Sequence, residues 1–225
     1  MSVKIMILEL FKAFGNTALI FVLTLLGSIP LGLLVYFGRK SRFVLLRGFI
    51  KAYISIMRGT PLMLQLMMVF YGPSLLIPLL FPGVKFSLPS NWRFTAVIIA
   101  FVINYAAYFC EIFRAGIESI PKGQYEAADV LGLTKSQTFF RIILPQMVKR
   151  VIPPVTNEVI TLVKDTSLSS AIGTVEMFTK AKQIAVAPKS PGMLTFVAAA
   201  VFYYVFNYAV AFLMERIEKK LDYYR

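Results

Sequence analysis

Long stretches without a charged residue constrain this chain more than any other feature. No Asp, Glu, Lys or Arg occurs between Lys12 and Arg39, or between Arg58 and Lys85. About 20 mostly apolar residues in a helix cross the ~30 Å hydrocarbon core of a bilayer. The hydrophobic share is 58%, above the about 45–50% of ordinary soluble domains. The sequence therefore predicts an all-α membrane protein.

The apolar runs predict five transmembrane helices in a single membrane domain that takes up residues 1–225. Thr60 and Pro61 are expected to begin the second span, as N-cap and first helical residue. We place the spans at residues 16–37, 60–80, 94–113, 151–170 and 192–214, with a longer polar loop at 119–146 between the third and the fourth.

The distribution of basic residues predicts the orientation of the spans. Lys and Arg are concentrated in the loops between spans 1 and 2 and between spans 3 and 4, and in the tail that ends at Arg225; the opposite side, with Lys85 among others, carries fewer. The positive-inside rule then places the N-terminus outside, and loop 119–146 and the C-terminus in the cytoplasm. Topology accounts for the net charge of +13, so we expect no nucleic-acid partner.

The chain lacks the residue types of several enzyme classes. It has no histidine, and its single cysteine, Cys110, lies in an apolar run. These facts exclude Ser-His-Asp and Cys-His catalytic groups and any zinc site built on imidazole. We expect no catalytic residue and no metal site, and Cys110 is interpreted as a small packing residue.

Loop 119–146 is patterned as two short helices. The first is expected to begin at Glu126, with acidic residues in its first turn, and to end at Gly132 in a left-handed conformation. Thr134 and Gln137 form a capping-box pattern that starts a second helix, which we expect to stop at Pro145. On these local signals alone, an ordinary amphipathic loop at the membrane interface fits equally well.

The spacing within this loop is more specific. Glu126-Ala127-Ala128, Gly132, Ile142 and Leu144-Pro145 resemble the cytoplasmic coupling loop, or EAA motif, of permease subunits in ABC importers. Three other segments are similar to the polar amino acid branch of that family, which imports histidine, glutamine and arginine: Arg58–Gln65, Tyr108–Gly116 and Lys164–Leu168. The resemblance covers residues 10–220. Cys110 departs from it, because a small residue such as alanine is expected at that position.

The resemblance implies a function and a set of partners. The chain contains no Gly-x4-Gly-Lys-Ser/Thr phosphate loop, so it is not expected to be an enzyme or to bind a cofactor; ATP and Mg belong to a partner. The partners implied are a dimer of ATP-binding subunits, a second permease that is either an identical copy (homodimer) or a related chain (heterodimer), and an extracytoplasmic solute-binding protein. The residues implied to contact the ATPase are Glu126, Ala127, Ala128, Gly132, Leu144 and Pro145.

The function implied is import of polar amino acids, with arginine, histidine, lysine and glutamine as candidates, by alternating access across the bacterial cytoplasmic (inner) membrane. Three alternatives stay open: an ABC permease for another small solute, an ATPase-independent secondary transporter, and an intramembrane enzyme or scaffold. Five spans without an internal repeat argue against the second, and the missing catalytic residue types argue against the third.

Polar side chains within spans suggest where a substrate binds, because ionisable groups in the bilayer usually face a protein interior or a water-filled path. In span 4 the spacing puts Glu158, Thr161 and Asp165 on one helix face. We hypothesise that Glu158 pairs with an ammonium or guanidinium group of the substrate. The full candidate set is Glu158, Asn157, Thr161, Asp165, Lys164, Asn104, Tyr108 and Gln65.

Structural roles compete with this hypothesis. Lys164 and Asp165 would also serve to anchor the end of a span, and Asn104 would also serve as an interhelical hydrogen-bond donor. Glu111, near the end of span 3, is interpreted as pairing with Arg114 three residues further along the helix.

Overall fold

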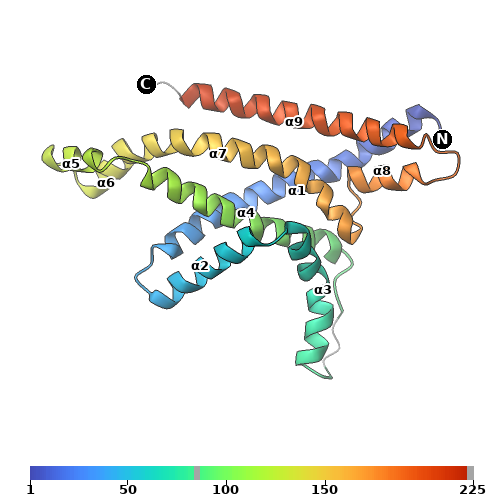
Figure 1. Cartoon of the computed structure of the whole chain (residues 1–225), viewed down its shortest axis with the longest axis horizontal. Helices are drawn as coiled ribbons and strands as arrows, with labels where there is room; N and C mark the ends of the chain where they lie inside the picture. The colour runs from blue at the N-terminus through green and yellow to red at the C-terminus, as the bar shows by residue number, and fades with distance from the viewer. Residues whose placement is uncertain (84–86, 222–225) are drawn as a thin grey trace.

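The computed structural model describes residues 1–83 and 87–221, and every regular element in these ranges is helical (Figure 1). Lys85 and Arg225, which contribute to the charge distribution, lie outside the described residues. The elements are α1 (Val3–Arg39), α2 (Val44–Gly59), α3 (Leu62–Leu80), α4 (Trp92–Glu118), α5 (Lys122–Val130), α6 (Lys135–Thr138), a π-helical turn η1 (Phe139–Ile143), α7 (Leu144–Asp165), a 3₁₀ segment η2 (Thr166–Ile172), α8 (Met177–Ala185) and α9 (Met193–Leu221).

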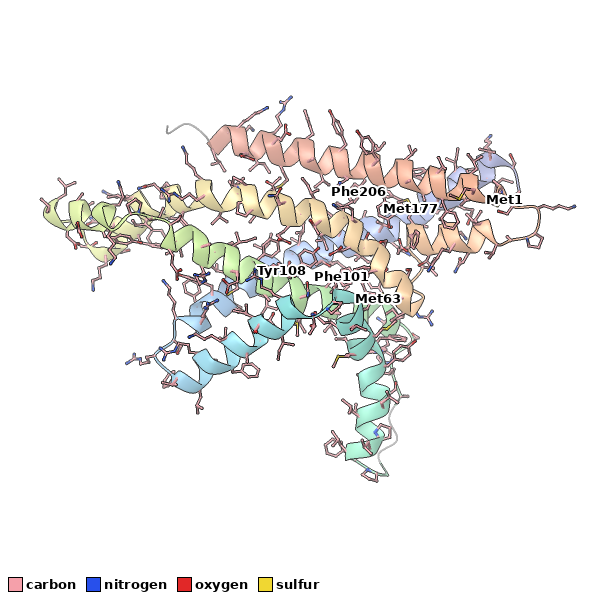
Figure 2. The ribbon with its side chains drawn as sticks, in the orientation of Figure 1. Met1, Met63, Phe101, Tyr108, Met177 and Phe206 are labelled. Carbon is pink, nitrogen blue, oxygen red and sulfur yellow. The ribbon has the colours of Figure 1, made fainter. Side chains whose placement is uncertain are left out.

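The centre of the molecule is the contact between α1 and α4. Phe101, Tyr105 and Phe109 of α4 are fully buried there, and Figure 2 shows Phe101 at the middle of the helix bundle. A Cβ added at Gly32 would lie 2.8 Å from the Phe109 Cβ and 3.0 Å from the Ala106 carbonyl oxygen. Glycine therefore permits this close approach of two helices, as small residues do in membrane bundles.

The helices are arranged between two distinct ends (Figure 1). The end formed by residues 122–143, named here the α5–α6 end, lies far from the end that α8 forms with the N-terminus, named here the α8 end. The helix α3 projects from the middle of the molecule, and many of its apolar side chains are exposed, Leu75 at 70% and Leu79 at 72% among them.

At the α8 end a buried apolar cluster joins α1, α8 and α9. Met6 and Leu10 of α1, Met177 and Ala181 of α8, and Ala199 of α9 form a buried apolar cluster. The N-terminus of α8 is capped by Glu176, whose side chain is fully buried.

Four helices are long and apolar enough to cross a membrane: α1, α3, α4 and α9. They contain or nearly coincide with four of the five predicted spans. The remaining predicted span, 151–170, falls on α7, which ends at Asp165 and continues as the 3₁₀ segment to Ile172. Its charged residues lower its hydropathy, so the count of five spans and the orientation stay predictions.

Helix boundaries differ from the predictions at the start of the second span. Thr60 is the C-cap of α2, and α3 begins at Leu62 with Pro61 at its N-cap. The Thr60 hydroxyl donates to the Ile56 carbonyl oxygen at 2.8 Å and so closes the preceding helix. The charge-rich loop expected before this span is itself mostly helical, because Ile50 and Ile54 of α2 pack into the bundle.

The predictions for loop 119–146 are partly wrong. The helix α5 begins at Lys122, so its first turn contains no acidic residue and Glu126 lies in the second turn. The second helix does not stop at Pro145. The wide π turn before α7 bonds the Leu144 amide to the Phe139 carbonyl, five residues back, and Pro145, in the first turn of α7, needs no amide partner.

Candidate functional site

A cleft of about 510 Å³ opens between α2, α4 and α7. Its charged lining consists of three arginines, Arg58, Arg114 and Arg150, and two glutamates, Glu111 and Glu158. Figure 2 shows Tyr108, which also lines the cleft, near the crossing of α2 and α4. The cleft thus places both signs of charge within one concave surface of the bundle.

Glu111 is the centre of an ion-pair cluster that joins three helices. One of its carboxylate oxygens lies 2.8 Å from Arg114 of α4 and 3.9 Å from Arg58 of α2. The other oxygen pairs with Arg39, the last residue of α1. The predicted pairing of Glu111 with Arg114 is confirmed. The ion pairs of Glu111 with Arg39 and Arg58 were not predicted, because spacing along one helix does not reveal which other helices pack beside it.

Arg58 also lies over the Tyr108 ring, with its guanidinium carbon 5.4 Å from the ring centroid. Arg150 donates to the Ser119 carbonyl oxygen at the end of α4. Two arginines from separate helices are therefore oriented at the edge of the cleft by contacts that leave donor groups available, because a guanidinium has five N–H groups.

Glu158 is the other carboxylate of the cleft. Its side chain is partly buried, and among the described residues it makes no ion pair within 4.0 Å and accepts no side-chain hydrogen bond. A partly buried carboxylate without a partner is costly. Of the predicted substrate residues, Glu158 and Tyr108 are the two that the structure brings together in the cleft.

Other predicted substrate residues are engaged with each other elsewhere. Asn104 and Gln65 are both buried, and the Asn104 amide donates to the Gln65 oxygen at 2.9 Å. Gln65 in turn donates to the Thr60 hydroxyl at 2.7 Å. This network links α3, α4 and the end of α2, so these amides hold helices together in the structure.

The remaining predicted residues of α7 differ in how far they are buried. Asp165 is partly buried and accepts a hydrogen bond from the Tyr105 hydroxyl at 2.7 Å, which ties α7 to α4. Asn157, Thr161 and Lys164 are exposed, and the Thr161 hydroxyl donates to the Asn157 carbonyl at 2.9 Å. Glu158, Thr161 and Asp165 share one face of α7, as their spacing predicts, but only Glu158 lines the cleft, while Thr161 is exposed and Asp165 is held by Tyr105.

The α5–α6 end carries the residues predicted to contact a partner. Glu126 and Ala127 are exposed, whereas Ala128 is fully buried against the rest of this end. Gly132 has φ +70°, the left-handed conformation predicted for it. The capping box of Thr134 and Gln137 is also present, with both reciprocal hydrogen bonds.

Two large apolar side chains of the α5–α6 end are almost fully exposed. Val130 is 88% exposed and Leu131 74% exposed, at the C-terminal end of α5. Leu144 and Pro145, at the start of α7, are partly buried. Side chains of this kind favour burial against another surface. Their exposure was not predicted, although the sequence Val130-Leu131 before a glycine at a helix end was the available signal.

Comparison with known proteins identifies the class. Residues 28–223 match the family described as binding-protein-dependent transport system inner membrane component. The chain belongs to this family of permease subunits of ABC importers, and the predicted membership is confirmed.

Two relatives show which members it resembles. The L-cystine transport system permease protein TcyB of Bacillus subtilis (strain 168) is 37% identical over 90% of this chain and 82% of its own length. The putative glutamine transport system permease protein GlnP of Rickettsia bellii (strain RML369-C) is 34% identical over 89% of this chain and 87% of its own length.

Solved structures agree on the fold. A crystal structure of an amino acid ABC transporter with histidines matches with a TM-score of 0.79 and 28% identity, covering 94% of both chains. The inward-facing MetNI methionine ABC transporter matches with a TM-score of 0.68, covering 98% of this chain and 99% of the other; at 19% identity it supports the fold alone.

Proposed function

We propose that this chain is the membrane-spanning permease of an ATP-driven importer for polar amino acids. It moves them across the bacterial cytoplasmic membrane by alternating access. The family, the relatives named for L-cystine and glutamine, and the amino acid transporter at TM-score 0.79 support this cargo class. The observation that carries the proposal is the cleft with an unpaired carboxylate opposite arginines.

In this proposal the cleft between α2, α4 and α7 binds the zwitterionic part of the amino acid. Glu158 accepts from the ammonium group, since its carboxylate has no ion-pair partner among the described residues. Arg58 and Arg150 donate to the carboxylate, because guanidinium groups match carboxylate geometry. A mobile ligand that supplies both charges would offset the cost of holding Glu158 unpaired.

The net charge of the cleft narrows the set of candidate amino acid substrates. Three arginines and two glutamates line it, so its net charge is positive. A positive site attracts an anion and repels a cation, whereas a zwitterion of zero net charge is spared this repulsion. This favours glutamine-like amino acids over the basic ones among the candidates. L-cystine, with two carboxylates and two ammonium groups, is the second candidate, favoured by the relative at 37% identity.

The proposed transporter complex contains three kinds of partner. A dimer of ATP-binding subunits, which holds ATP and Mg, binds the α5–α6 end, where Val130 and Leu131 provide apolar contacts and Glu126 a charge. A short helix in a groove is a common mode of such recognition. A second permease copy encloses the path from the exposed side of α7, and a solute-binding protein delivers cargo at the α8 end.

The test is amino acid uptake by the purified permease with its ATPase and binding protein in proteoliposomes. Glu158→Gln keeps the size of the side chain and removes its charge. We expect the KM for a neutral polar amino acid to rise by about tenfold or more, because charge-assisted hydrogen bonds contribute about twice as much as neutral ones. Glu215→Gln, an exposed carboxylate at the end of α9, is the matched control and should leave uptake unchanged.

Arg58→Gln sharpens the assignment of the carboxylate partner. The variant should lose affinity for the amino acid and lose far less for its carboxamide analogue, which lacks the negative charge. Unchanged uptake by Glu158→Gln, at equal protein levels and with the control intact, would contradict this placement of the cargo.

A further inference from the structure

The turn between α1 and α2 and the first turns of α2 carry basic side chains without acidic partners in the described residues. Arg42, Arg47 and Lys51 are exposed, and none of them lies within 4.0 Å of a carboxylate in the described parts of the chain. The sequence gives the reason. No Asp or Glu occurs between Glu9 and Glu111, and Glu111 is already surrounded by the arginines of its own cluster. The positive charge of these side chains is therefore uncompensated by any carboxylate in residues 1–83 and 87–221.

The same segment, from the turn into the first turns of α2, exposes large apolar side chains. Phe43 is 68% exposed, Leu45 89% and Phe49 73%. Single exposed apolar residues are ordinary, but here three lie within two helical turns of one another, which is typical of a surface that is covered by something else.

Helix geometry separates the two kinds of residue. Arg47 and Lys51 are four residues apart and share one flank of α2, whereas Leu45 and Phe49, also four apart, share another. Between these flanks Ile50 faces the bundle and is buried. The first turns of α2 thus present an apolar strip that faces away from the bundle and an exposed basic strip on the flank next to the buried Ile50 and Ile54.

The position of the turn fixes the depth at which these strips lie. It follows Arg39, where the apolar helix α1 ends, and so lies where a span leaves the hydrocarbon core. It is also on the side of the molecule nearer to the α5–α6 end (Figure 1). At this depth, apolar side chains enter the acyl region while Lys and Arg reach the headgroups.

We propose that this surface, named the α1–α2 surface and made of Arg42, Phe43, Leu45, Arg47, Phe49 and Lys51, binds anionic phospholipid. The basic strip contacts the phosphate headgroups, and the apolar strip contacts the acyl chains. Each Lys or Arg near a leaflet of anionic lipid adds to the attraction, which zwitterionic lipid does not provide.

Charge also argues against the main competing occupant, a second copy of the chain. In a symmetric dimer the same surface meets itself. That contact would bring two uncompensated basic strips together, and like charges repel most strongly where water is excluded. An anionic lipid supplies the missing negative charge instead.

The experiment measures lipid binding directly, without amino acid or ATP, so its outcome is independent of the proposed transport function. The full-length permease, purified with its ATPase in detergent, is titrated with phosphatidylglycerol and with phosphatidylcholine of the same acyl chains. Native mass spectrometry counts the bound lipids. The wild type should bind phosphatidylglycerol more tightly by about tenfold or more, and high salt should reduce this preference.

The test variant combines Arg42→Gln, Arg47→Gln and Lys51→Gln, and should lose most of the preference. The matched control combines Lys4→Gln, Lys182→Gln and Lys189→Gln, three exposed basic residues of the α8 end, and should keep it. Equal binding of both lipids by the wild type, or an unchanged preference in the test variant, would overturn the proposal.

A cross-linking arm tests the second copy. The native Cys110 is buried, so the introduced cysteine is the accessible thiol in the variant Phe49→Cys. This variant permease should stay monomeric when it is oxidised in membranes. Efficient disulfide-linked dimers would place a second copy on the α1–α2 surface and overturn lipid as its occupant.

Discussion

The two ends of the molecule differ in how their polar and apolar groups are satisfied. At the α8 end, Glu176 is fully buried and accepts hydrogen bonds from the amides of Phe178 and Thr179 at 2.7 and 2.6 Å and from the Tyr203 hydroxyl at 2.8 Å. At the α5–α6 end, Ala128 is the one buried residue of α5, and Val130 and Leu131 are exposed.

This difference in side-chain contacts indicates which end requires another protein to cover its exposed groups. Burial raises the pKa of the Glu176 carboxyl, and the donors around it oppose that rise. Such a group is tolerated only where its partners are already in place within the same chain. The polar network around Glu176 at the α8 end is therefore complete within the described residues, although apolar side chains such as Val186 are exposed there too. At the α5–α6 end the backbone has the predicted conformation and Val130 and Leu131 are exposed, as expected of a surface that another protein covers.

The largest expected effect comes from removing the buried cap. Glu176→Ala leaves two amides and two hydroxyls without their acceptor, and we expect a loss of about 3 kcal/mol in unfolding free energy. The buried Cys110, the single cysteine of the chain, makes the measurement direct. A thiol-reactive fluorophore labels it on unfolding during a thermal ramp. Glu215→Ala should melt like the wild type, and an equal melting temperature for Glu176→Ala would remove the distinction between the ends.

A second effect is expected at Gly132, on the other end. With φ +70°, a β-branched residue is strained there by about 1–3 kcal/mol. We expect Gly132→Val to reduce amino acid uptake by about tenfold or more while the thermal ramp of Cys110 labelling changes little. Gly132→Asn, which tolerates the left-handed conformation, should recover most of the uptake. Normal uptake in the valine variant would show that this bend has no part in transport.

A third, smaller effect compares two valines with matched exposure. Val130 is 88% exposed at the α5–α6 end and Val186 85% exposed at the α8 end. Val130→Ser should weaken binding of the ATPase by about tenfold, which corresponds to the loss of one buried valine. Val186→Ser should leave the binding of the ATPase unchanged. The measurement is the affinity of the purified ATPase for the permease in nanodiscs, and equal effects of both substitutions would indicate that Val130 is not at the contact.

The smallest effect is expected for the capping box. Thr134→Ala removes the side-chain acceptor of the Gln137 amide, at a cost of about 1 kcal/mol. The loss should be local, because few contacts connect α6 to the bundle. Hydrogen exchange should become faster in α6 and stay the same in α8. Faster exchange at both ends would mean that they fold as one unit.

Sequence reasoning reached the local features of the fold well and the long-range ones poorly. Gly132, the capping box and the burial of Cys110 follow from chemistry within a few residues, and the structure confirms them. The start of α5 and the continuation of the helix through Pro145 were not predicted. A proline is expected to end a helix unless the π turn that precedes it is known.

The site shows the same division. Spacing along α7 found Glu158, and spacing along α4 found Tyr108, which line one cleft. It did not find Arg58 and Arg150, since these come from other elements and are brought together by packing. It also grouped Asp165 with Glu158, although Asp165 is held by Tyr105. Helix periodicity gives the face of a residue but not its neighbour.

The π turn before α7 has a mechanical consequence. The chain stays helical without a break from Lys135 to Asp165, so the exposed end of α6 and the carboxylate of Glu158 belong to one continuous helical segment. They are separated by about 35 Å along its axis. Two sites at which helices commonly bend lie between them, the π turn Phe139–Ile143 and the prolines Pro153 and Pro154, so a displacement of α6 would reach Glu158 through these bends.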